Sequence, residues 1–432
     1  MVAMRATQFH GSFGGCKAAR MGPNFYRKNA WWLGTGLLLN FASTFGQTYF
    51  IALSGGGIRA EFGLSNGEWG GIYTIATIMS AATLILIGRF ADTVALVRLA
   101  VIVFAIYALA AVLMMNANSV VMLALAIYGL RFCGQGMMVL LSMTAMARWF
   151  AANRARAVAI TVLGFPLGEA LFPFAAVQIQ ALGDWRTVWG VVAVFVAFVV
   201  LPAAFVLLRQ GRTPQNEGAG DSAVGMGGRH WTRGEVLRHW SFYALLPGIL
   251  AAPFIGTCAM FHQVHIAAVH GFDLKVMALA FPVYAATSVI SSLTAGSLID
   301  RIGPTRMLPF MVLPLGIGVA ALALPGGVWI WFAVLAGVAM SQGIAVTMMG
   351  ALWPTLYGTR SIGSVKAILS AAMVAATAIG PGITGFIIDA GVTFPEQALF
   401  MSAYCVAMAV LFAFVAPRLR AELPPVAAAH PA

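Results

Sequence analysis

Two charged residues interrupt apolar stretches of this chain, and they are its sharpest candidates for chemistry. Arg131 and Glu169 each fall within a stretch long enough to cross a membrane, on either side of one short turn. At about 1.5 Å of helix per residue, counting back from that turn puts both at a similar depth. A charge near the bilayer centre costs about 2.5–3.5 kcal/mol and faces a cavity or a partner. We therefore expect an Arg131–Glu169 pair that binds substrate, a proton or both. The alternative is a structural ion pair between adjacent helices.

Polar residues on a predicted first helix form a second candidate group. Asn40, Thr44 and Gln47 are spaced four and three residues apart, which puts them on one helical face. Gln135 follows Arg131 by about one turn and could share its cavity. These side chains either line a substrate path or form the hydrogen bonds between helices that polar residues make in membranes.

A pair of histidines lies near the end of another apolar stretch. His262 and His265 are spaced so that both rings lie on one side of a helix. They could form an outer gate or sense protons, because the pKa of histidine lies near neutrality. Packing with interfacial hydrogen bonds is the alternative. Zinc needs more ligands than this pair supplies, so we expect no metal site, and nothing in the chain calls for a cofactor.

Charged turns occur twice, at the ends of two apolar stretches that lie about half the chain apart. An acidic residue six positions before an arginine, across a helix end, can cap or pair with a neighbouring helix. We expect these turns to act as gates, and they also carry charge that fixes topology. The residues are Gly88, Asp92 and Arg98 in the first copy, and Gly296, Asp300, Arg301, Gly303 and Arg306 in the second.

The two copies of the turn keep one constant offset along the chain. The interval from Gly88 to Gly296 equals the interval from Asp92 to Asp300 and from Arg98 to Arg306. This interval is called the repeat offset below. A constant offset of about half the chain predicts two similar halves.

The elements that must position these residues are membrane helices. The chain is 61% hydrophobic and only 9% charged, against roughly 25% charged in soluble domains. Twelve apolar segments are long enough to span a bilayer. In chain order these predicted helices lie near 31–54, 68–90, 97–116, 119–143, 155–178, 186–208, 241–268, 276–298, 306–324, 328–350, 364–388 and 397–416. The repeat offset divides them between the two halves. We expect an all-α membrane protein of two six-helix bundles. Its expected parts are a tail (1–30), the first bundle (31–208), a linker (209–240), the second bundle (241–416) and a second tail (417–432).

The distribution of positive charge predicts the orientation. With the N-terminus inside, 21 of the 25 Lys and Arg residues fall in cytoplasmic segments, so both termini should be cytoplasmic. This bias explains the net charge of +12 without a nucleic-acid partner. There is no nucleotide-binding loop or catalytic arrangement, so we expect neither an ATPase nor another enzyme.

The repeated turns resemble the Gly-x-Leu-x-Asp-Arg-x-Gly-x-x-Arg loop of the major facilitator superfamily. The second copy matches from Gly296 to Arg306, and the first retains Gly88, Asp92 and Arg98. Within that superfamily, the stretches 45–50, 148–154 and 261–265 resemble bacterial members of the monocarboxylate and oxalate–formate branch. Carboxylate carriers of that branch commonly have a basic residue in helix 8 or 11. Here helix 8 has none, and Lys366 lies near the start of helix 11.

The resemblance implies a secondary transporter that works by alternating access, as a monomer in the cell membrane. It implies a small organic anion such as a monocarboxylate, moved by proton coupling or by exchange. Arg131 supports this substrate as a candidate counter-charge. An efflux pump for amphipathic compounds is the first alternative, since the chain has 22 Met and 29 Phe residues. A membrane sensor that does not transport is the second, and a Gly-rich linker is a poor signalling domain.

Overall fold

The computed structural model describes residues 24–88, 90–150, 154–209 and 224–423, without the side chains of Asn24, Asp92, Thr93, Arg154 and Ala155. The described residues fold into helices with no strand. Eleven helical segments among them are long and apolar enough to cross a membrane. The remaining predicted span, the first in the chain, near 31–54, is present as three shorter pieces.

The first half runs from α1 to α12. Its elements are α1 (Asn24–Ala42), η1 (Ser43–Gly46), α2 (Thr48–Leu53), α3 (Gly55–Phe62), α4 (Asn66–Ile87), α5 (Phe90–Thr93), α6 (Leu96–Met115), α7 (Val120–Leu130), η2 (Arg131–Met138), α8 (Val139–Trp149), α9 (Arg154–Thr161), α10 (Gly164–Leu182), α11 (Trp185–Phe195), η3 (Val196–Val200) and α12 (Leu201–Leu208).

The second half runs from η4 to α21. Its elements are η4 (Met226–Gly228), α13 (Arg233–Arg238), α14 (Trp240–Phe261), α15 (Gln263–His270), α16 (Leu274–Ala278), α17 (Ala280–Ile302), α18 (Pro304–Ala320), η5 (Ala321–Ala323), α19 (Trp329–Tyr357), α20 (Ile362–Asp389) and α21 (Phe394–Ala421).

The repeat offset extends well beyond the charged turns. Helices α3 and α15 both begin and end at this offset from each other. The first residues of α6 and α18 are separated by the same offset, and so are those of α9 and α20. Gly63 and Gly271 both end a short helix in the left-handed conformation, with φ of 64° and 70°. The two halves predicted from the sequence are therefore repeats of one structural unit.

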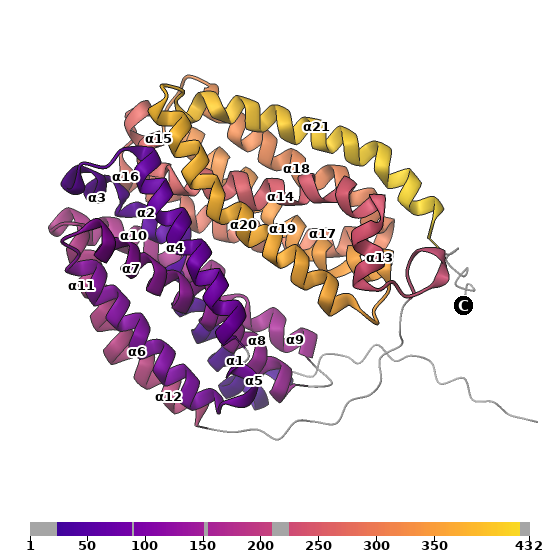
Figure 1. Cartoon of the computed structure of the whole chain (residues 1–432), viewed down its shortest axis with the longest axis horizontal. Helices are drawn as coiled ribbons and strands as arrows, with labels where there is room; N and C mark the ends of the chain where they lie inside the picture. Colours follow the sequence, from indigo (N-terminus) through magenta and orange to yellow (C-terminus); the bar gives the residue numbers. More distant parts are fainter. Residues whose placement is uncertain (1–23, 89, 151–153, 210–223, 424–432) are drawn as a thin grey trace, which may run out of the picture.

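The helix ends fall on two sides of the molecule, named here after the acids that close α20 and α17. On the Asp389 side, α4 packs along α20, and α10 packs against α16 and α17. Figure 1 shows the two bundles meeting at the end where α3 and α15 lie, and diverging toward α9 and α13 on the Asp300 side. The charge distribution predicts that the Asp300 side is cytoplasmic.

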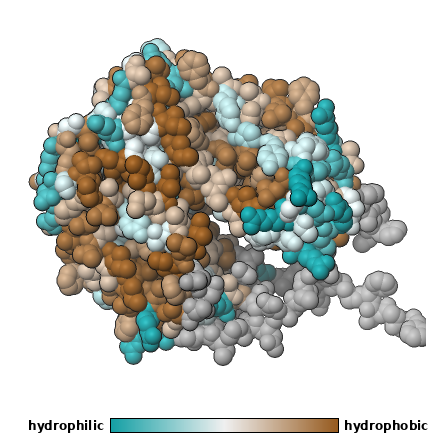
Figure 2. Space-filling model, in the orientation of Figure 1, coloured by the Kyte–Doolittle hydropathy of each residue, from teal (hydrophilic) through white to brown (hydrophobic). Residues whose placement is uncertain are grey.

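The surface agrees with a membrane location. Figure 2 shows hydrophobic side chains along the flanks of both bundles and hydrophilic ones gathered mainly toward the helix ends. Large apolar side chains such as Ile85, Phe198 and Phe414 are at least 70% exposed. Contact with lipid accounts for such exposure, because water would not tolerate so extensive an apolar surface.

Part of the predicted linker belongs to the second bundle. The Trp231 backbone N–H donates to Tyr357 O at 3.0 Å, and its indole N–H donates to Met226 O at 3.0 Å. Gly227 N donates to Glu422 O at 2.9 Å, near the end of the chain. Residues 224–240 therefore rest on the Asp300 side of the second half.

Candidate functional site

The first membrane span is broken in its middle. Helix α1 ends at Ala42, η1 is a short 3-10 turn, and Gln47 is extended, with φ −82° and ψ 152°, before α2 resumes. A break inside a membrane frees backbone groups, which must find other partners. Here Tyr107 Oη donates to Ala42 O at 3.2 Å, and it lies 3.4 Å from Ser43 O.

Arg131 supplies another partner for this break. It is 1% exposed and opens η2, a π-helical segment of the fourth span. One terminal nitrogen, Nη1, donates to Gly46 O at 3.0 Å and to Thr48 Oγ1 at 3.3 Å. The guanidinium carbon lies 5.2 Å from the centre of the Tyr73 ring, a cation–π distance.

Arg131 is left with unused hydrogen-bonding capacity. Within the described part of the chain, its Nε and Nη2 atoms are buried without a hydrogen-bond partner. None of the ion pairs between described residues includes it. A buried guanidinium that lacks a counter-ion is costly, so this position is a candidate for an incoming anion.

Glu169 lies elsewhere, between the two halves. It is half-buried on α10 and close enough to Tyr49 and Tyr284 to interact with both electrostatically. Tyr284 lies on α17, in the other half. In the described structure the Glu169 carboxylate makes neither a hydrogen bond nor an ion pair.

The predicted Arg131–Glu169 pair is not formed in this structure. The broken part of the first span explains why, because η1 packs against both η2 and α10. Arg131 is engaged by Gly46 O and Thr48 Oγ1, whereas Glu169 interacts with Tyr49 and Tyr284. Regular helix periodicity gives no sign of such an insertion.

The polar residues predicted to line a path along the first span are mostly engaged with neighbouring helices. Asn40 Nδ2 donates to Thr161 O at 2.8 Å, while its Oδ1 is buried without a partner in the described structure. Thr44 is buried against Gly168, where a Cβ on the glycine would come within 2.0 Å of Thr44 Oγ1. Gln47 and Gln135 are half-buried. Asn40 and Thr44 thus contact α9 and α10, as residues that join helices do.

The two histidines lie on the Asp389 side. His262 is 3% exposed, and its Nε2 lies 2.9 Å from Thr384 Oγ1 and 3.2 Å from Pro381 O, both on α20. His265 is half-buried, with Nε2 3.5 Å from Phe394 N. No group of three metal-binding side chains occurs among the described residues.

The repeated charged turns are open to solvent in this structure. Asp300, Arg301, Arg306 and Arg98 are exposed, and none of them takes part in an ion pair within the described segments. The side chain of Asp92 lies outside the described residues.

The glycines of these turns mark helix ends and a close contact. Gly88 and Gly303 end α4 and α17, and Gly303 needs to be glycine because its φ is 81°. Gly296 faces α19 within the second half, where a Cβ on the glycine would lie 3.7 Å from Thr347 Cγ2. That distance is an ordinary van der Waals contact, so alanine would also fit at position 296.

Two features of the site were not predicted from the sequence. They are the Asp389 carboxylate and the break in the first span, whose carbonyl Gly46 O accepts from Arg131. Asp389 Oδ1 and Oδ2 accept from the backbone N–H groups of Asn66 and Gly67, at 3.0 and 2.7 Å, across the two halves. The available signal was an acid at the end of an apolar stretch. The Ser-Thr-Phe-Gly run at 43–46, poor in strong helix formers, was the signal for the break.

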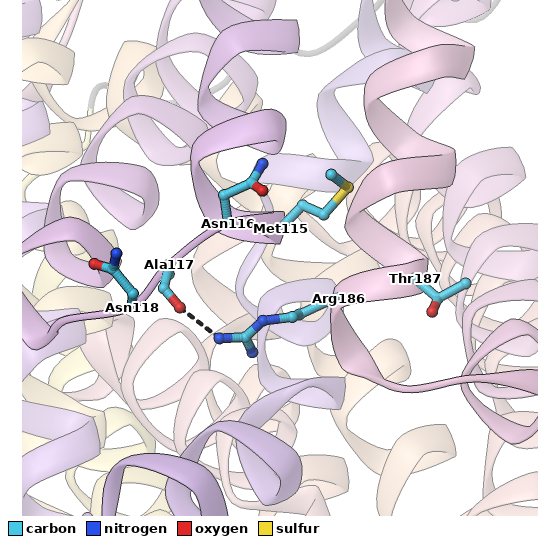
Figure 3. A pocket seen from close by; sticks show the side chains of 6 residues that line it. All are labelled: Met115, Asn116, Ala117, Asn118, Arg186 and Thr187. Carbon is cyan, nitrogen blue, oxygen red and sulfur yellow. Dashed lines mark hydrogen bonds between the residues drawn. The ribbon is translucent and has the colours of Figure 1, made fainter.

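A surface pocket lies apart from all of these residues. It has a volume of about 460 Å³ and lies where α6 ends and α11 begins, on the Asp389 side. Figure 3 shows Arg186 reaching across it to the Ala117 carbonyl. Because Arg186 is also paired with Glu61 at 2.6 Å, its charge is already compensated.

Comparisons with known proteins identify the chain's relatives. A sequence profile of the Major Facilitator Superfamily matches residues 36–365, and a second match covers 254–431. No curated protein matches the chain. Among solved structures, a bacterial homologue of the human lysosomal transporter Spinster, inward-facing and unoccupied, has a TM-score of 0.68 at 19% identity. That match covers 94% of this chain and 100% of the homologue. The nucleoside transporter NupG matches with a TM-score of 0.65 at 13% identity, over 89% of this chain and 98% of its own.

Proposed function

Because the chain belongs to the major facilitator superfamily, we propose that it is a secondary active transporter of a small organic anion such as a monocarboxylate. It works by alternating access, as a monomer in the cell membrane with both termini in the cytoplasm. The positive charge on the Asp300 side supports this orientation. The sequence stretches shared with the monocarboxylate and oxalate–formate branch support the substrate class.

The observation that carries the proposal is the unused half of the Arg131 guanidinium. Nη1 is engaged by Gly46 O and Thr48 Oγ1, whereas Nε and Nη2 are buried without a partner among the described residues. Those two N–H groups form one edge of the guanidinium fork, which matches a carboxylate in a bidentate fashion. An anion bound there would supply the counter-charge that the described protein residues do not.

Access to Arg131 requires the broken span to move. The side chain is sealed by Tyr73 and by the residues around Gly46 in this arrangement. The 3-10 turn and the extended Gln47 interrupt the α-helical hydrogen bonding of the span, so this segment can shift at lower cost than an intact helix. Movement of η1 would expose the free edge of Arg131 to the space between the bundles.

Glu169 supports protons as the coupling ion. Its carboxylate is half-buried between Tyr49 and Tyr284, at the junction of the halves, and has no fixed counter-ion in the described structure. A carboxyl in such a setting changes its proton affinity when hydration or a nearby charge changes. Binding of an anion and a proton can thereby be linked.

A second candidate is efflux of cationic amphipathic compounds, and one observation favours it. The Glu169 carboxylate lies close to Tyr284 of the other half in this arrangement, whereas Arg131 is sealed within the first half. Aromatic rings lie on the same helix and its neighbour, with the Phe172 centroid 4.6 Å from Phe41 and 4.5 Å from Phe45. A carboxylate close to Tyr49 and Tyr284, on a helix that also carries Phe172, suits a cation with an apolar body.

Counterflow in proteoliposomes tests the proposal. Vesicles loaded with one unlabelled compound would be given trace amounts of the same compound in labelled form, using a panel of mono- and dicarboxylates and a panel of lipophilic cations. We expect saturable counterflow of at least one carboxylate. Counterflow restricted to the cations would overturn the proposal in favour of efflux.

A further inference from the structure

The two halves are tied together on the Asp389 side by one carboxylate. Helix α4 begins at Asn66, and the first backbone N–H groups of any helix lack partners within it. Asp389, the last residue of α20, accepts from Asn66 N at 3.0 Å and Gly67 N at 2.7 Å, one oxygen for each. An anion at this position also interacts favourably with the helix dipole.

Close backbone packing brings the two helices to this contact. A Cβ on Gly70 would come within 2.4 Å of Pro381 O, and one on Gly385 within 2.5 Å of Asn66 O. Thr74 Oγ1 donates to Ala378 O at 2.7 Å further along the same pair of helices. The contact therefore sits at the end of a continuous seam between the halves.

The first and seventh spans reinforce the same side. Gln263 Nε2, on α15, donates to Tyr49 O, on α2, at 2.9 Å. Arg59 and His265 lie close enough to Asp389 to interact with it electrostatically. Asp389 itself is exposed, so water can replace its hydrogen bonds when the halves separate.

The arrangement is not duplicated by the internal repeat. The repeat offset places Ala181 as the counterpart of Asp389, near the end of α10, which packs against α16. Helix α16 is instead capped by its own preceding residue, Asp273, which accepts from Lys275 N at 2.8 Å. Of the two pseudo-symmetric seams in the described structure, only that between α4 and α20 has this carboxylate.

We propose that Asp389 is a gate residue, a latch between the halves that holds the Asp389 side of the transporter closed. Its two hydrogen bonds must break each time that side opens, so their strength sets the balance between the two arrangements. This inference rests on transport by alternating access and is independent of the substrate.

Distances between spin labels on the Asp389 side would test this latch without any substrate. Asn118 and Ala323 are exposed on that side, in different halves. Labels would be attached at cysteines introduced there, in a chain whose Cys16, Cys133, Cys258 and Cys405 are replaced by alanine. The distance distribution reports the fraction of molecules that are open on this side.

The contact can be removed by substituting either of its partners, Asp389 on α20 or Asn66 on α4. Asp389→Ala deletes the carboxylate and Asp389→Asn removes its charge. Asn66→Pro deletes one of the N–H groups, and proline is well tolerated at the first position of a helix. The extended backbone of Ser65, with φ −68° and ψ 172°, suits a residue before proline. Asp184→Asn is the matched control, because Asp184 caps α11 within one half, through Thr187 N at 2.8 Å.

We expect Asp389→Ala and Asn66→Pro to raise the ratio of open to closed molecules roughly three- to tenfold, as removal of exposed charge-assisted contacts at a helix end does. Asp389→Asn should have a smaller effect, and Asp184→Asn none. The Ala and Pro variants should not add when combined, because they break the same contact. Spin-label distance distributions in Asp389→Ala and Asn66→Pro that are the same as in the parent chain would overturn the proposed latch. So would an equal shift in Asp184→Asn. Failure of carboxylate counterflow would leave this result unaffected.

Discussion

At the residue scale, the sequence predicts which charges lie deep in the bilayer but not what they contact. The depths of Arg131 and Glu169 follow from counting helical residues from a charged turn. That they do not pair could not be predicted, because the 3-10 turn η1 and the extended Gln47 leave no periodic pattern in the sequence. The hydrogen bond from Arg131 to Gly46 O, at 3.0 Å, is a consequence of that break.

Glu169 offers a direct test of proton coupling. Glu169→Gln keeps the shape of the side chain and removes its exchangeable proton. The variant should lose accumulation driven by a proton gradient and retain exchange, because exchange need not move a proton. Uptake and counterflow in the same proteoliposomes measure the two activities.

The control for this experiment is Glu235→Gln, which changes an exposed carboxylate on the Asp300 side. It should keep both activities. Equal loss of accumulation and exchange in Glu169→Gln would mean that the carboxylate maintains the structure of the junction and does not carry the proton.

At the element scale, the break in the first span is the feature that the sequence concealed. Eleven spans were predicted near their observed positions because long apolar stretches must be helical in lipid. The first span carries more polar residues, among them Asn40, Thr44 and Gln47. It contains a 3-10 turn and an extended residue. Contacts from Tyr107 and Arg131 make this possible, because their side chains donate to the carbonyls that lack helical partners.

Glycine at position 46 is required for this arrangement. A Cβ there would come within 2.2 Å of Leu130 O and 2.8 Å of the Gly134 Cα. Gly46→Ala should therefore destabilise the protein by about 1–3 kcal/mol, the usual cost of overpacking, and reduce transport. Thermal unfolding in detergent, followed by tryptophan fluorescence, would measure the loss.

Gly34→Ala is the matched control in the same span. A Cβ there meets nothing within 4 Å, so the change should be neutral or stabilise helix α1 by about 0.5–1 kcal/mol. A Gly46→Ala variant as stable as Gly34→Ala would show that the first and fourth spans do not need this close approach.

At the scale of the whole molecule, the sequence predicts the internal repeat but not which side of the molecule is closed. The constant offset between two charged turns predicted two similar halves, and several helix boundaries keep that offset. Which side is closed depends on contacts between the halves, such as Asp389 with α4, and no repeat encodes them. Asp300 and Arg306 are exposed to solvent. They lie on the side where the two bundles diverge (Figure 1).

The repeated turns should act in the opposite sense to Asp389. If Asp300 stabilises closure of its own side, Asp300→Asn should favour the arrangement described here, with that side open. The Asn118–Ala323 label distance would then shift toward its shorter values. Loss of a partly buried charged contact amounts to a few kcal/mol, enough to move a two-state population strongly.

Asp92→Asn should act in the same direction but more weakly, because the first copy of the turn departs from the family pattern at more positions. An unchanged label distance in Asp300→Asn would mean that these charges determine topology alone.

Substitution of Arg131 tests the central claim, that its free edge binds the substrate anion. Counterflow of the carboxylate identified in the panel should be abolished in Arg131→Gln and partly retained in Arg131→Lys, since lysine keeps the charge and loses the bidentate fork. Both variants should be produced as monodisperse protein, and Arg186→Gln, which alters a surface ion pair, should transport normally. Normal counterflow by Arg131→Gln would contradict the account.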